Sequence, residues 1–302
     1  MADPKKASLR SVIARKELVI APGVIDMITA RLADKMGFHA LYMTGYGVTA
    51  SSLGLPDAGL ATYSDMLSRV RTICEGTSTP LIADADTGYG GLINVRHTVR
   101  GYEAAGAQGI QIEDQEMPKK CGHTPGRRVI PAEEMVLKVK VAVDSRRSED
   151  TLIIARTDAR TTLGLDEALR RGEAYAEAGA DIIFVESPES EDELAKIARS
   201  ISKPVLANMV QFGRTPLLTE KQLRDMGFAV AIYPGIALGA VAEAARRAYL
   251  FLKQHGTSKD IDVPMYEPRT SGQSLHELMG FPDIWAFEKR WQMPDVRQTA
   301  AE

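Results

Sequence analysis

The sequence predicts an α/β protein of the (βα)8 TIM-barrel class with a C-terminal helical extension, and three observations support this prediction. Eight short apolar or β-branched runs alternate with amphipathic segments from Leu18 onward. Runs such as LIIAR and IIFVE are apolar up to their last residue, as expected of strands buried on both faces of a parallel sheet. Eight such units in series favour a closed barrel, with an open doubly wound sheet as the structural alternative.

The expected elements alternate in chain order. Strands are expected at Leu18–Ala21, Ala40–Thr44, Pro80–Asp86, Gly109–Gln115, Thr151–Asp158, Asp181–Ser187, Pro204–Val210 and Ala229–Pro234. Crossover helices are expected at Asp26–Met36, Tyr63–Glu75, Asn94–Ala105, Pro131–Arg147, Asp166–Ala178, Glu191–Ser200 and Thr219–Met226, with an eighth from about Gly235 to His255.

Helix-end signals support these boundaries. Thr219 stands three residues before Gln222, which is the spacing of a capping box, and Ser190 precedes an acidic first turn. Glycines suited to a helix C′ position follow several of the expected helices, at Gly37, Gly106, Gly179 and Gly227.

We interpret residues 1–302 as a single barrel domain, with the barrel over about 18–256 and the extension over about 257–302. The extension carries a set of apolar and aromatic residues: Leu275, Leu278, Met279, Trp285, Phe287 and Trp291. Side chains of this kind need a surface to cover once the barrel is complete, so we expect the extension to make contacts in a homo-oligomer.

Composition and charge exclude several classes of protein. The chain is 44% hydrophobic and 25% charged, as in an ordinary globular protein. A net charge of -3 gives no reason to expect nucleic acid or an anionic membrane as a partner, and no apolar stretch reaches the length of about 18 residues that spans a membrane. The two cysteines, Cys74 and Cys121, are too few for a disulfide framework and favour a cytoplasmic location, with a short organellar signal left open.

Polar residues interrupt the strands where they end, and the carboxyl ends of barrel strands carry the functional groups. These residues are Asp84, Asp86, Glu113, Asp114, Arg156, Asp158, Glu186 and Asn208. Several carboxylates without a His/Cys cluster indicate an oxygen site for Mg²⁺, with Mn²⁺ as the alternative ion. Asp114 and Asp158 could equally be loop charges or helix caps, whereas the D-A-D pattern at the end of a strand directs the side chains of Asp84 and Asp86 the same way.

The segment MPKKCGHTPGRRVI, just after the expected strand Gly109–Gln115, is rich in glycine, proline and basic residues. It is typical of an active-site loop. Its positive charge beside an acidic metal site would attract a carboxylate-rich ligand, and Cys121 then becomes a candidate proton donor. The simpler interpretation is an exposed basic loop with an incidental cysteine.

The motif KKCGH after a strand ending IEDQ, with ADADTGYGG before it and SLGLPD earlier, is similar to the isocitrate lyase and phosphoenolpyruvate mutase superfamily. The likeness covers nearly the whole chain. The pattern K-[KR]-C-G-H is the signature of the lyase branch, and the phosphonate-forming mutases lack this cysteine. The chain resembles the 2-methylisocitrate lyases and 2,3-dimethylmalate lyases most.

This resemblance implies roles for particular residues. Asp84 would be the direct metal ligand, and Asp57, Asp86 and Glu113 would hold the ion through its waters. The catalytic group would comprise Cys121 as the acid, with Lys119, Arg156, Tyr42 and Glu186, of which Tyr42 and Glu186 are the candidate bases. Substrate contacts are implied for Thr44, Gly45, Tyr46, Asp84, Gly122, His123, Arg156, Asn208 and Pro234. Most relatives have S-G-[AG] where this chain has Thr44, Gly45 and Tyr46, so Tyr46 is a departure.

The resemblance also implies a Mg²⁺-dependent lyase that releases pyruvate from a 2-hydroxy di- or tricarboxylate, with the last barrel helix swapped between the subunits of a tetramer. Relatives that act on 2-methylisocitrate usually carry an arginine where this chain has Gly239, which favours a dicarboxylate such as 2,3-dimethylmalate. An oxaloacetate hydrolase or decarboxylase and a phosphonate-forming mutase are the alternatives. Pro234, in place of a serine of oxaloacetate hydrolases, argues against the hydrolase, and Cys121, which the mutases lack, argues against the mutase. A barrel that binds metal and ligand without catalysis is a more remote alternative.

Overall fold

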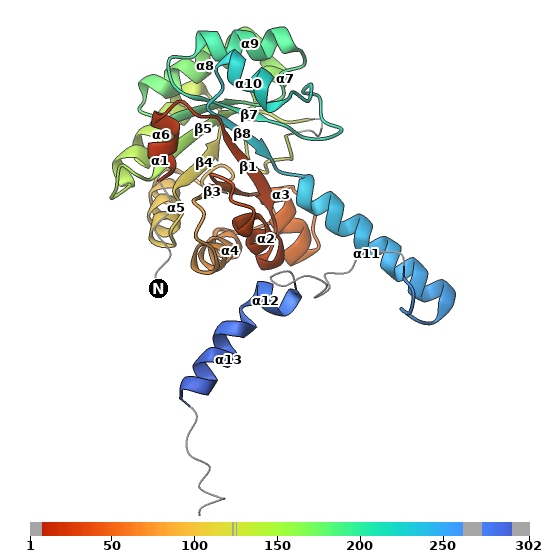
Figure 1. The fold of residues 1–302 in the computed structure, drawn as a ribbon. Coiled ribbons are helices and arrows are strands. Elements are labelled where there is room, and N and C mark those ends of the chain that lie inside the picture. The colour runs from red at the N-terminus through yellow and green to blue at the C-terminus, as the bar shows by residue number, and fades with distance from the viewer. Residues whose placement is uncertain (1–7, 123, 125, 262–273, 292–302) are drawn as a thin grey trace, which may run out of the picture. The chain divides into compact units, whose positions relative to one another are not determined.

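The computed structural model describes residues 8–122, 124, 126–261 and 274–291, and its central feature is a closed parallel barrel (Figure 1). Each strand pairs with the next, and β1 pairs with β8 through the register Val19↔Val230, which closes the ring. The strands are β1 Val19–Val24, β2 Leu41–Met43, β3 Leu81–Asp84, β4 Gly109–Glu113, β5 Leu152–Thr157, β6 Ile182–Val185, β7 Val205–Asn208 and β8 Val230–Tyr233. The prediction of a closed barrel, and not an open sheet, is therefore confirmed.

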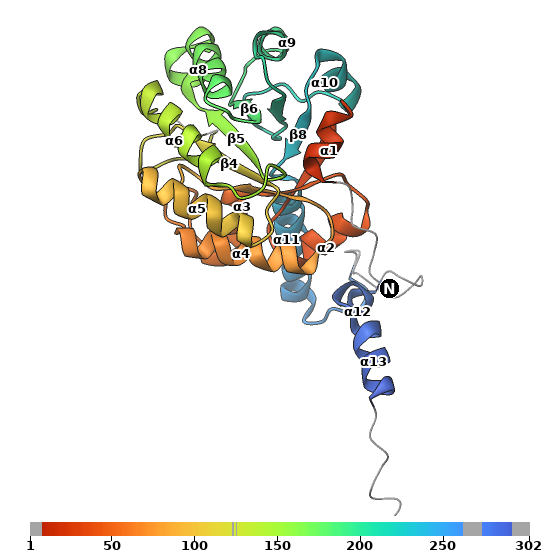
Figure 2. The ribbon, with the colours of Figure 1, turned by 90° about the vertical axis from the view of Figure 1, so that its left-hand side faces the viewer.

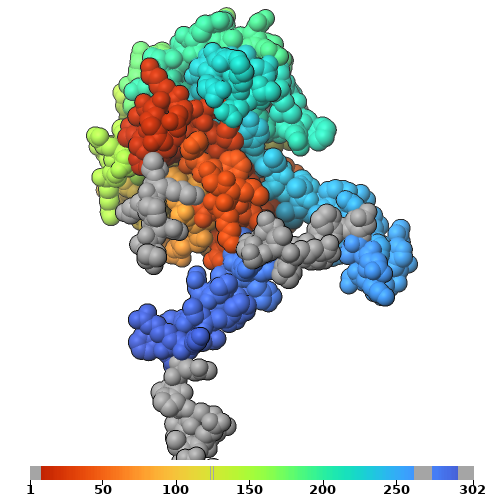
Figure 3. All heavy atoms as spheres, viewed as in Figure 1, coloured from red at the N-terminus to blue at the C-terminus, as the bar shows by residue number. Residues whose placement is uncertain are grey.

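Amphipathic helices cover the outside of the barrel (Figures 1 and 2). They are α2 Met27–Lys35, α4 Tyr63–Gly76, α5 Leu92–Ala104, α6 Ala132–Ser145, α8 Leu165–Glu177, α9 Glu191–Ser200 and α10 Glu220–Met226. Helices α9 and α10 pack side by side on the surface, in green and cyan in Figure 3. The predicted caps are present, because Ser190 accepts from the Glu193 amide and Thr219 forms a capping box with Gln222.

The barrel interior is filled by alternating strand residues, among them Val19, Ile154 and Phe184. Helix α1, Leu9–Ala14, lies outside the elements expected from the sequence, and its Leu9 and Val12 are buried in this same interior cluster. The Leu9 amide donates to Gln108 Oε1, just before β4, so α1 lies at the amino ends of the strands. Helix α1 therefore covers the amino end of the barrel, and a binding site is expected at the carboxyl end.

Short helices at the carboxyl ends also lie outside the expected pattern. Helix α3, Gly45–Val48, continues into the π-helical turn η1, Thr49–Leu53, directly after β2, and α7, Ala159–Leu163, follows β5. Thr44 caps α3 by accepting from the Gly47 amide. These short helices place backbone groups at the carboxyl ends of strands β2 and β5.

The chain divides into two compact units, Met1–Glu243 and Ala244–Glu302. Helix α11, Ile236–His255, begins in the first unit and ends in the second, which also contains α12, Leu275–Met279, and α13, Phe281–Arg290. In the second unit Phe281 contacts His276 and Trp285 through their rings. Within the described part of the chain, no helix has both the length and the apolar character needed to cross a membrane.

Candidate active site

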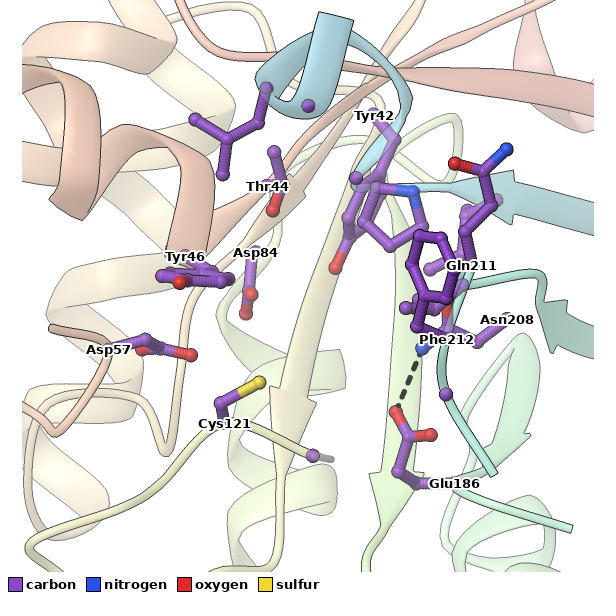
Figure 4. A pocket seen from close by; sticks show the side chains of 18 of the residues that line it. Tyr42, Thr44, Tyr46, Asp57, Asp84, Cys121, Glu186, Asn208, Gln211 and Phe212 are labelled. Carbon is purple, nitrogen blue, oxygen red and sulfur yellow. Dashed lines mark hydrogen bonds between the residues drawn. The ribbon is translucent and has the colours of Figure 1, made fainter. Parts of the chain in front are cut away.

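A cavity of about 360 Å³ opens at the carboxyl ends of the barrel strands (Figure 4). Its lining residues come from seven of the eight strand ends or the loops that follow them: Tyr42, Thr44, Tyr46, Asp57, Asp84, Cys121, Gly122, Arg156, Glu186, Asn208, Val210, Phe212, Ile232 and Pro234. Most of the residues that the sequence analysis selected therefore face one cavity.

Asp84 ends β3, and its carboxylate is oriented by the backbone of two neighbouring loops. The Gly45 amide donates to Oδ2 at 3.2 Å, the Asp86 amide donates to Oδ1 at 3.1 Å, and Gln111 Nε2 lies 3.4 Å from Oδ1. A Cβ on Gly45 would lie only 2.6 Å from Asp84 Oδ2, so the glycine permits this close approach. Asp84 is thus held in place while facing the cavity.

Asp86 lies beside Asp84, but for a reason that differs from the prediction. Strand β3 ends at Asp84, so strand alternation does not orient Asp86, whose backbone is left-handed with φ 46°. An ideal Cβ at Gly45 would meet Asp84 Oδ2 at 2.6 Å and Asp86 Oδ1 at 3.4 Å, so both carboxylates approach the same point. The turn, and not the pleat, brings them together.

Lys119 compensates the charge of this region. Its Nζ forms an ion pair with Asp57 and another, at 2.7 Å, with Asp86 Oδ1. Burial lowers the pKa of Lys119, but the carboxylates of Asp86 and Glu113 outweigh it and raise this pKa well above its usual value. Lys119 is therefore a buried cation behind the cavity lining and does not face the cavity itself.

Glu113, at the end of β4, has a buried carboxylate oxygen without a hydrogen-bond partner among the described residues, Oε1. Its other oxygen lies 3.4 Å from Arg156 Nε. Burial raises the pKa of Glu113 well above its usual value, although the Arg156 charge opposes this shift. We call Asp57, Asp84, Asp86, Glu113 and Lys119 the acidic side of the site.

The acidic side was tested for its fit to a metal ion. No group of three or more Asp, Glu, His or Cys side chains placed to hold an ion is found among the described residues. The carboxylate oxygens present are nevertheless of the kind that Mg²⁺ takes, usually together with several waters. The unpartnered Glu113 Oε1 offers such a water an acceptor.

Arg156, at the end of β5, is held by three carboxylates. It forms a bidentate pair with Asp158, with both nitrogen–oxygen distances at 2.9 Å, and its Nη2 lies 3.2 Å from Glu186 Oε2. Its guanidinium carbon lies 5.0 Å from the centre of the Phe184 ring. Burial lowers the pKa of Arg156, but Asp158 and Glu186 outweigh it and keep this pKa well above its usual value.

Glu186 follows β6 and is fully buried. Oε2 accepts from Asn208 Nδ2 at 3.1 Å, drawn in Figure 4, and Oε1 accepts from the Ser187 amide at 2.7 Å. Ser187 Oγ also lies 3.1 Å from the Gly122 carbonyl oxygen. This carboxylate is therefore linked both to β7 and to the segment that carries Cys121.

Cys121 lies on the segment after β4, and its thiol points into the cavity from the side where Asp84 and Asp57 lie (Figure 4). The Cys121 amide donates to the Asp57 carbonyl at 3.2 Å. Next to it, Gly122 packs so closely that a Cβ there would lie 2.5 Å from Arg156 Nη2. The glycine allows the segment to lie against Arg156, and the cysteine thiol shares one cavity with Asp84.

Tyr42, on β2, lines the cavity and donates to Gln111 Oε1 at 3.3 Å. Burial and the Asp84 charge raise the pKa of Tyr42 well above its usual value. Its phenol therefore stays protonated at neutral pH and acts as a hydrogen-bond donor.

Several other lining residues have apolar side chains without charge. Val210 and Phe212 follow β7, Ile232 and Pro234 belong to the end of β8, and Leu238 belongs to α11. We call these five residues the apolar side. Phe212 has a left-handed backbone with φ 62° and a fully exposed side chain at the cavity rim.

The remaining predicted residues divide into three groups. Thr44 and the half-exposed Tyr46 line the cavity, whereas Gly45 acts behind it through its amide. His123 lies outside the described residues. Asp114 is absent from the cavity lining and accepts from Tyr175 and Thr157. It is fully buried, so it is neither the loop charge nor the helix cap considered as its alternative.

Sequence reasoning missed two buried residues that organise the site. Gln111 connects Tyr42 with Asp84, and the signal for it was a polar residue within the otherwise apolar run GIQIE. Arg127 reaches Asp158 from the segment after Cys121. Its sequence neighbour Arg128 is exposed, so no local pattern separates the two arginines.

Comparison with known proteins gives consistent matches over the whole barrel. The family model described as phosphoenolpyruvate phosphomutase matches residues 9–252. The 2,3-dimethylmalate lyase of Eubacterium barkeri is 47% identical over 285 residues, covering 94% of this chain and 97% of the relative. The 2-methylisocitrate lyase of Aeropyrum pernix is 45% identical over 282 residues, covering 93% and 88%.

Two solved structures are similar throughout. A crystal structure of 2,3-dimethylmalate lyase, described as a member of the PEP mutase/isocitrate lyase superfamily, has a TM-score of 0.87 at 35% identity and covers 94% of both chains. A structure of oxaloacetate acetylhydrolase with the inhibitor 3,3-difluorooxalacetate has a TM-score of 0.88 at 34% identity and covers 97% of this chain and 98% of the other.

Proposed function

Because this chain belongs to the phosphoenolpyruvate phosphomutase family, within the PEP mutase/isocitrate lyase superfamily, we propose that it is a carbon–carbon lyase for a 2-hydroxy dicarboxylate such as 2,3-dimethylmalate. The reaction releases pyruvate and a carboxylic acid. The observation that carries the proposal is that Asp84 and Cys121 line the same cavity, so a charge-stabilising site and a proton donor can act on one small acid.

The choice of a dicarboxylate rests on the charges around the cavity. Arg156 is the one arginine or lysine among the described lining residues, and the apolar side offers no charged partner. Gly239 lines the cavity without a side chain, and a Cβ there would meet nothing within 4 Å. A third carboxylate of 2-methylisocitrate would lose its own charged partner, whereas an alkyl group fits the apolar side.

The proposal includes Mg²⁺, with Mn²⁺ as the alternative, at the acidic side. Asp84 would bind the ion directly, and Asp57, Asp86 and Glu113 would hold its waters. A bound divalent cation supplies electrostatic stabilisation of the negative charge that develops on the substrate oxygens. Support comes from the converging carboxylates and from the unpartnered Glu113 Oε1.

Substrate binding and proton removal are assigned to residues of the protein. Arg156 binds a substrate carboxylate, and the Tyr42 phenol donates a hydrogen bond, because its raised pKa keeps it protonated. We assign removal of the C2 hydroxyl proton to Glu186, the other candidate base, whose carboxylate Asn208 and Ser187 orient toward the cavity.

The bond changes then balance. As the proton leaves the C2 hydroxyl, C2 becomes the carbonyl carbon of pyruvate and the C2–C3 electron pair passes to the departing carboxylate enolate. Cys121 transfers its proton to C3 of that fragment, and the proton taken up by Glu186 returns to the thiolate through solvent before the next turnover. This step needs a reduced thiol, so we place the protein in the cytoplasm.

The proposal also includes a homo-oligomer, a tetramer in which the last barrel helix is exchanged between subunits. Helix α11 has no buried residue, and it exposes Ile236, Val241, Tyr249 and Leu250. Exposed apolar side chains along a 20-residue helix favour burial in an interface. Light scattering should give about four times the mass of one chain.

A substrate panel tests the function directly. The purified chain with Mg²⁺ is assayed with 2,3-dimethylmalate, other 3-alkylmalates that carry the 2-methyl group, 2-methylisocitrate, oxaloacetate and phosphonopyruvate. We expect pyruvate from the alkylmalates. Oxalate and acetate from oxaloacetate would instead identify a hydrolase, pyruvate from oxaloacetate a decarboxylase, and phosphoenolpyruvate from phosphonopyruvate a mutase. Absence of turnover with every compound would favour a barrel that only binds.

A further inference from the structure

Arg127 is a buried cation that the proposed reaction does not use. It lies on the same segment as Cys121, and its side chain is only 1% exposed. Nη1 lies 2.5 Å from Asp158 Oδ1, and Nη2 donates to Thr161 Oγ1 at 2.6 Å. Burying a guanidinium is unfavourable unless it is paired, so these two contacts indicate a specific binding position for the Arg127 side chain.

The carboxylate that receives Arg127 is the one that holds Arg156. Asp158 accepts from Arg156 Nε through Oδ2 and from Arg156 Nη2 through Oδ1, both at 2.9 Å. Oδ1 is therefore shared between a guanidinium that faces the cavity and one that comes from the Cys121 segment. Together the two arginines keep the pKa of Asp158 below its usual value, against the effect of burial.

Asp158 is itself held firmly. Its backbone amide donates to Asp114 Oδ1 at 2.9 Å. Asp114 Oδ2 accepts from Tyr175 at 2.8 Å and from Arg171 Nη1 at 3.1 Å, and both of these residues belong to α8. Arg127 thus docks on a rigid anchor.

The segment makes other contacts at both of its ends. At the near end Lys119 pairs with Asp86 of the acidic side. Gln115 exchanges two hydrogen bonds with the Lys120 backbone, each at 2.9 Å. The Gly122 carbonyl lies 3.1 Å from Ser187 Oγ. At the far end the Glu116 amide donates to the Arg128 carbonyl at 2.9 Å and Gln115 forms a bridge with Val129. Arg127 adds the buried ion pair with Asp158 at this end.

We infer that Arg127 is a positioning residue: by docking on Asp158 it holds the Cys121 segment over the cavity and sets the charge that Arg156 presents to the substrate. A carboxylate shared by two cations neutralises each of them less, so Arg156 stays more positive toward the cavity while Arg127 is docked. The inference rests on the proposed lyase reaction and assigns a residue to the assembly of that site.

The test compares Arg127→Gln with Arg127→Lys and with Arg128→Gln. Arg128 is the matched control, because it is the next residue on the segment but has an exposed side chain paired with Glu116. In Arg127→Gln we expect kcat to fall about 100-fold through misplacement of the Cys121 segment, and KM for the dicarboxylate to rise. Arg127→Lys should recover much of the loss in KM, because it restores the cation at Asp158.

Alkylation by iodoacetamide, mapped by mass spectrometry, gives a second readout that needs no turnover. Cys121 should react about 10-fold faster in Arg127→Gln than in Arg128→Gln, because local opening exposes its thiol. Cys74 is the internal control for global unfolding, since burial raises its pKa to about 12 and it reacts slowly while the chain is folded.

The outcomes separate the possibilities. Equal Cys121 alkylation and equal kcat in Arg127→Gln and Arg128→Gln would overturn the inference. If Cys74 also reacts, Arg127→Gln has unfolded, and Thr161→Val replaces it, because it removes only the Nη2 acceptor. Faster Cys121 alkylation in Thr161→Val supports the inference, and an unchanged rate rejects it. A wild-type chain without lyase activity would refute the proposed function, while the alkylation result still decides the docking role of Arg127.

Discussion

The acidic and apolar sides of the cavity are built by different means. On the acidic side, backbone amides and ion pairs orient each carboxylate, as the Gly45 and Asp86 amides do for Asp84. On the apolar side, Ile232, Pro234 and Leu238 present surface without charge. The difference teaches that the acidic side determines the chemistry through directed charge, whereas the apolar side determines which substrate fits through size and polarity.

The largest effect should come from the centre of the acidic side. Asp84→Ala removes the direct ligand proposed for Mg²⁺, so we expect kcat to fall about 10⁴-fold, equivalent to several kcal/mol of transition-state stabilisation. Glu113→Gln, which changes a carboxylate proposed to act through water, should cost far less. Steady-state kinetics and Mg²⁺ titration by calorimetry measure both. Equal losses in the two variants would remove the distinction between direct and water-mediated carboxylates.

Cys121→Ser tests the proposed proton donor, which lines the same cavity as Asp84. A serine hydroxyl keeps the size of the side chain but is a much weaker acid, so we expect kcat to fall about 10²–10⁴-fold. Cys74→Ala, at the other cysteine, should keep the wild-type rate. An unchanged rate in Cys121→Ser would exclude the cysteine as the acid.

Adding one methyl group at Gly45, beside Asp84, and another at Gly239, next to Leu238 of the apolar side, sharpens the comparison. In Gly45→Ala the new Cβ would lie 2.6 Å from Asp84 Oδ2 and push the carboxylate aside, so we expect kcat to fall about 100-fold. Gly239→Ala is the matched control, because its Cβ would meet nothing within 4 Å. Kinetics with thermal unfolding of both variants separate displacement of Asp84 from loss of the fold. Similar kcat values would mean that the acidic side tolerates displacement.

The smallest effect concerns selectivity on the apolar side. Gly239→Arg adds a bidentate carboxylate partner, so the ratio of kcat/KM for 2-methylisocitrate to that for 2,3-dimethylmalate should rise about 10-fold. Gly239→Gln has comparable reach without the charge and should leave the ratio near its wild-type value. If both variants change the ratio equally, size and not charge sets the preference.

Much of the fold could be predicted because its signals are local. The apolar run LIIAR forms β5, buried at every position, and Ser190 and Thr219 cap the helices that they were expected to begin. Helix α1 was missed because its buried Leu9 and Val12 have a partner only once the barrel has closed. The position of Asp86 was expected for another reason, since its left-handed turn is not visible in a D-A-D pattern.

The sequence by itself determined the alternation of strands and helices, the acidic residues at the strand ends and the KKCGH segment, because periodicity and residue type act over short distances. Only the tertiary structure decided that Lys119 lies behind the cavity lining, that Asp114 faces α8, and that Arg127 and not Arg128 docks on Asp158. In each case the interacting charged groups are 31 or more residues apart in the sequence. Closure of the barrel brings them within hydrogen-bond distance, so their pairing cannot be predicted from local sequence.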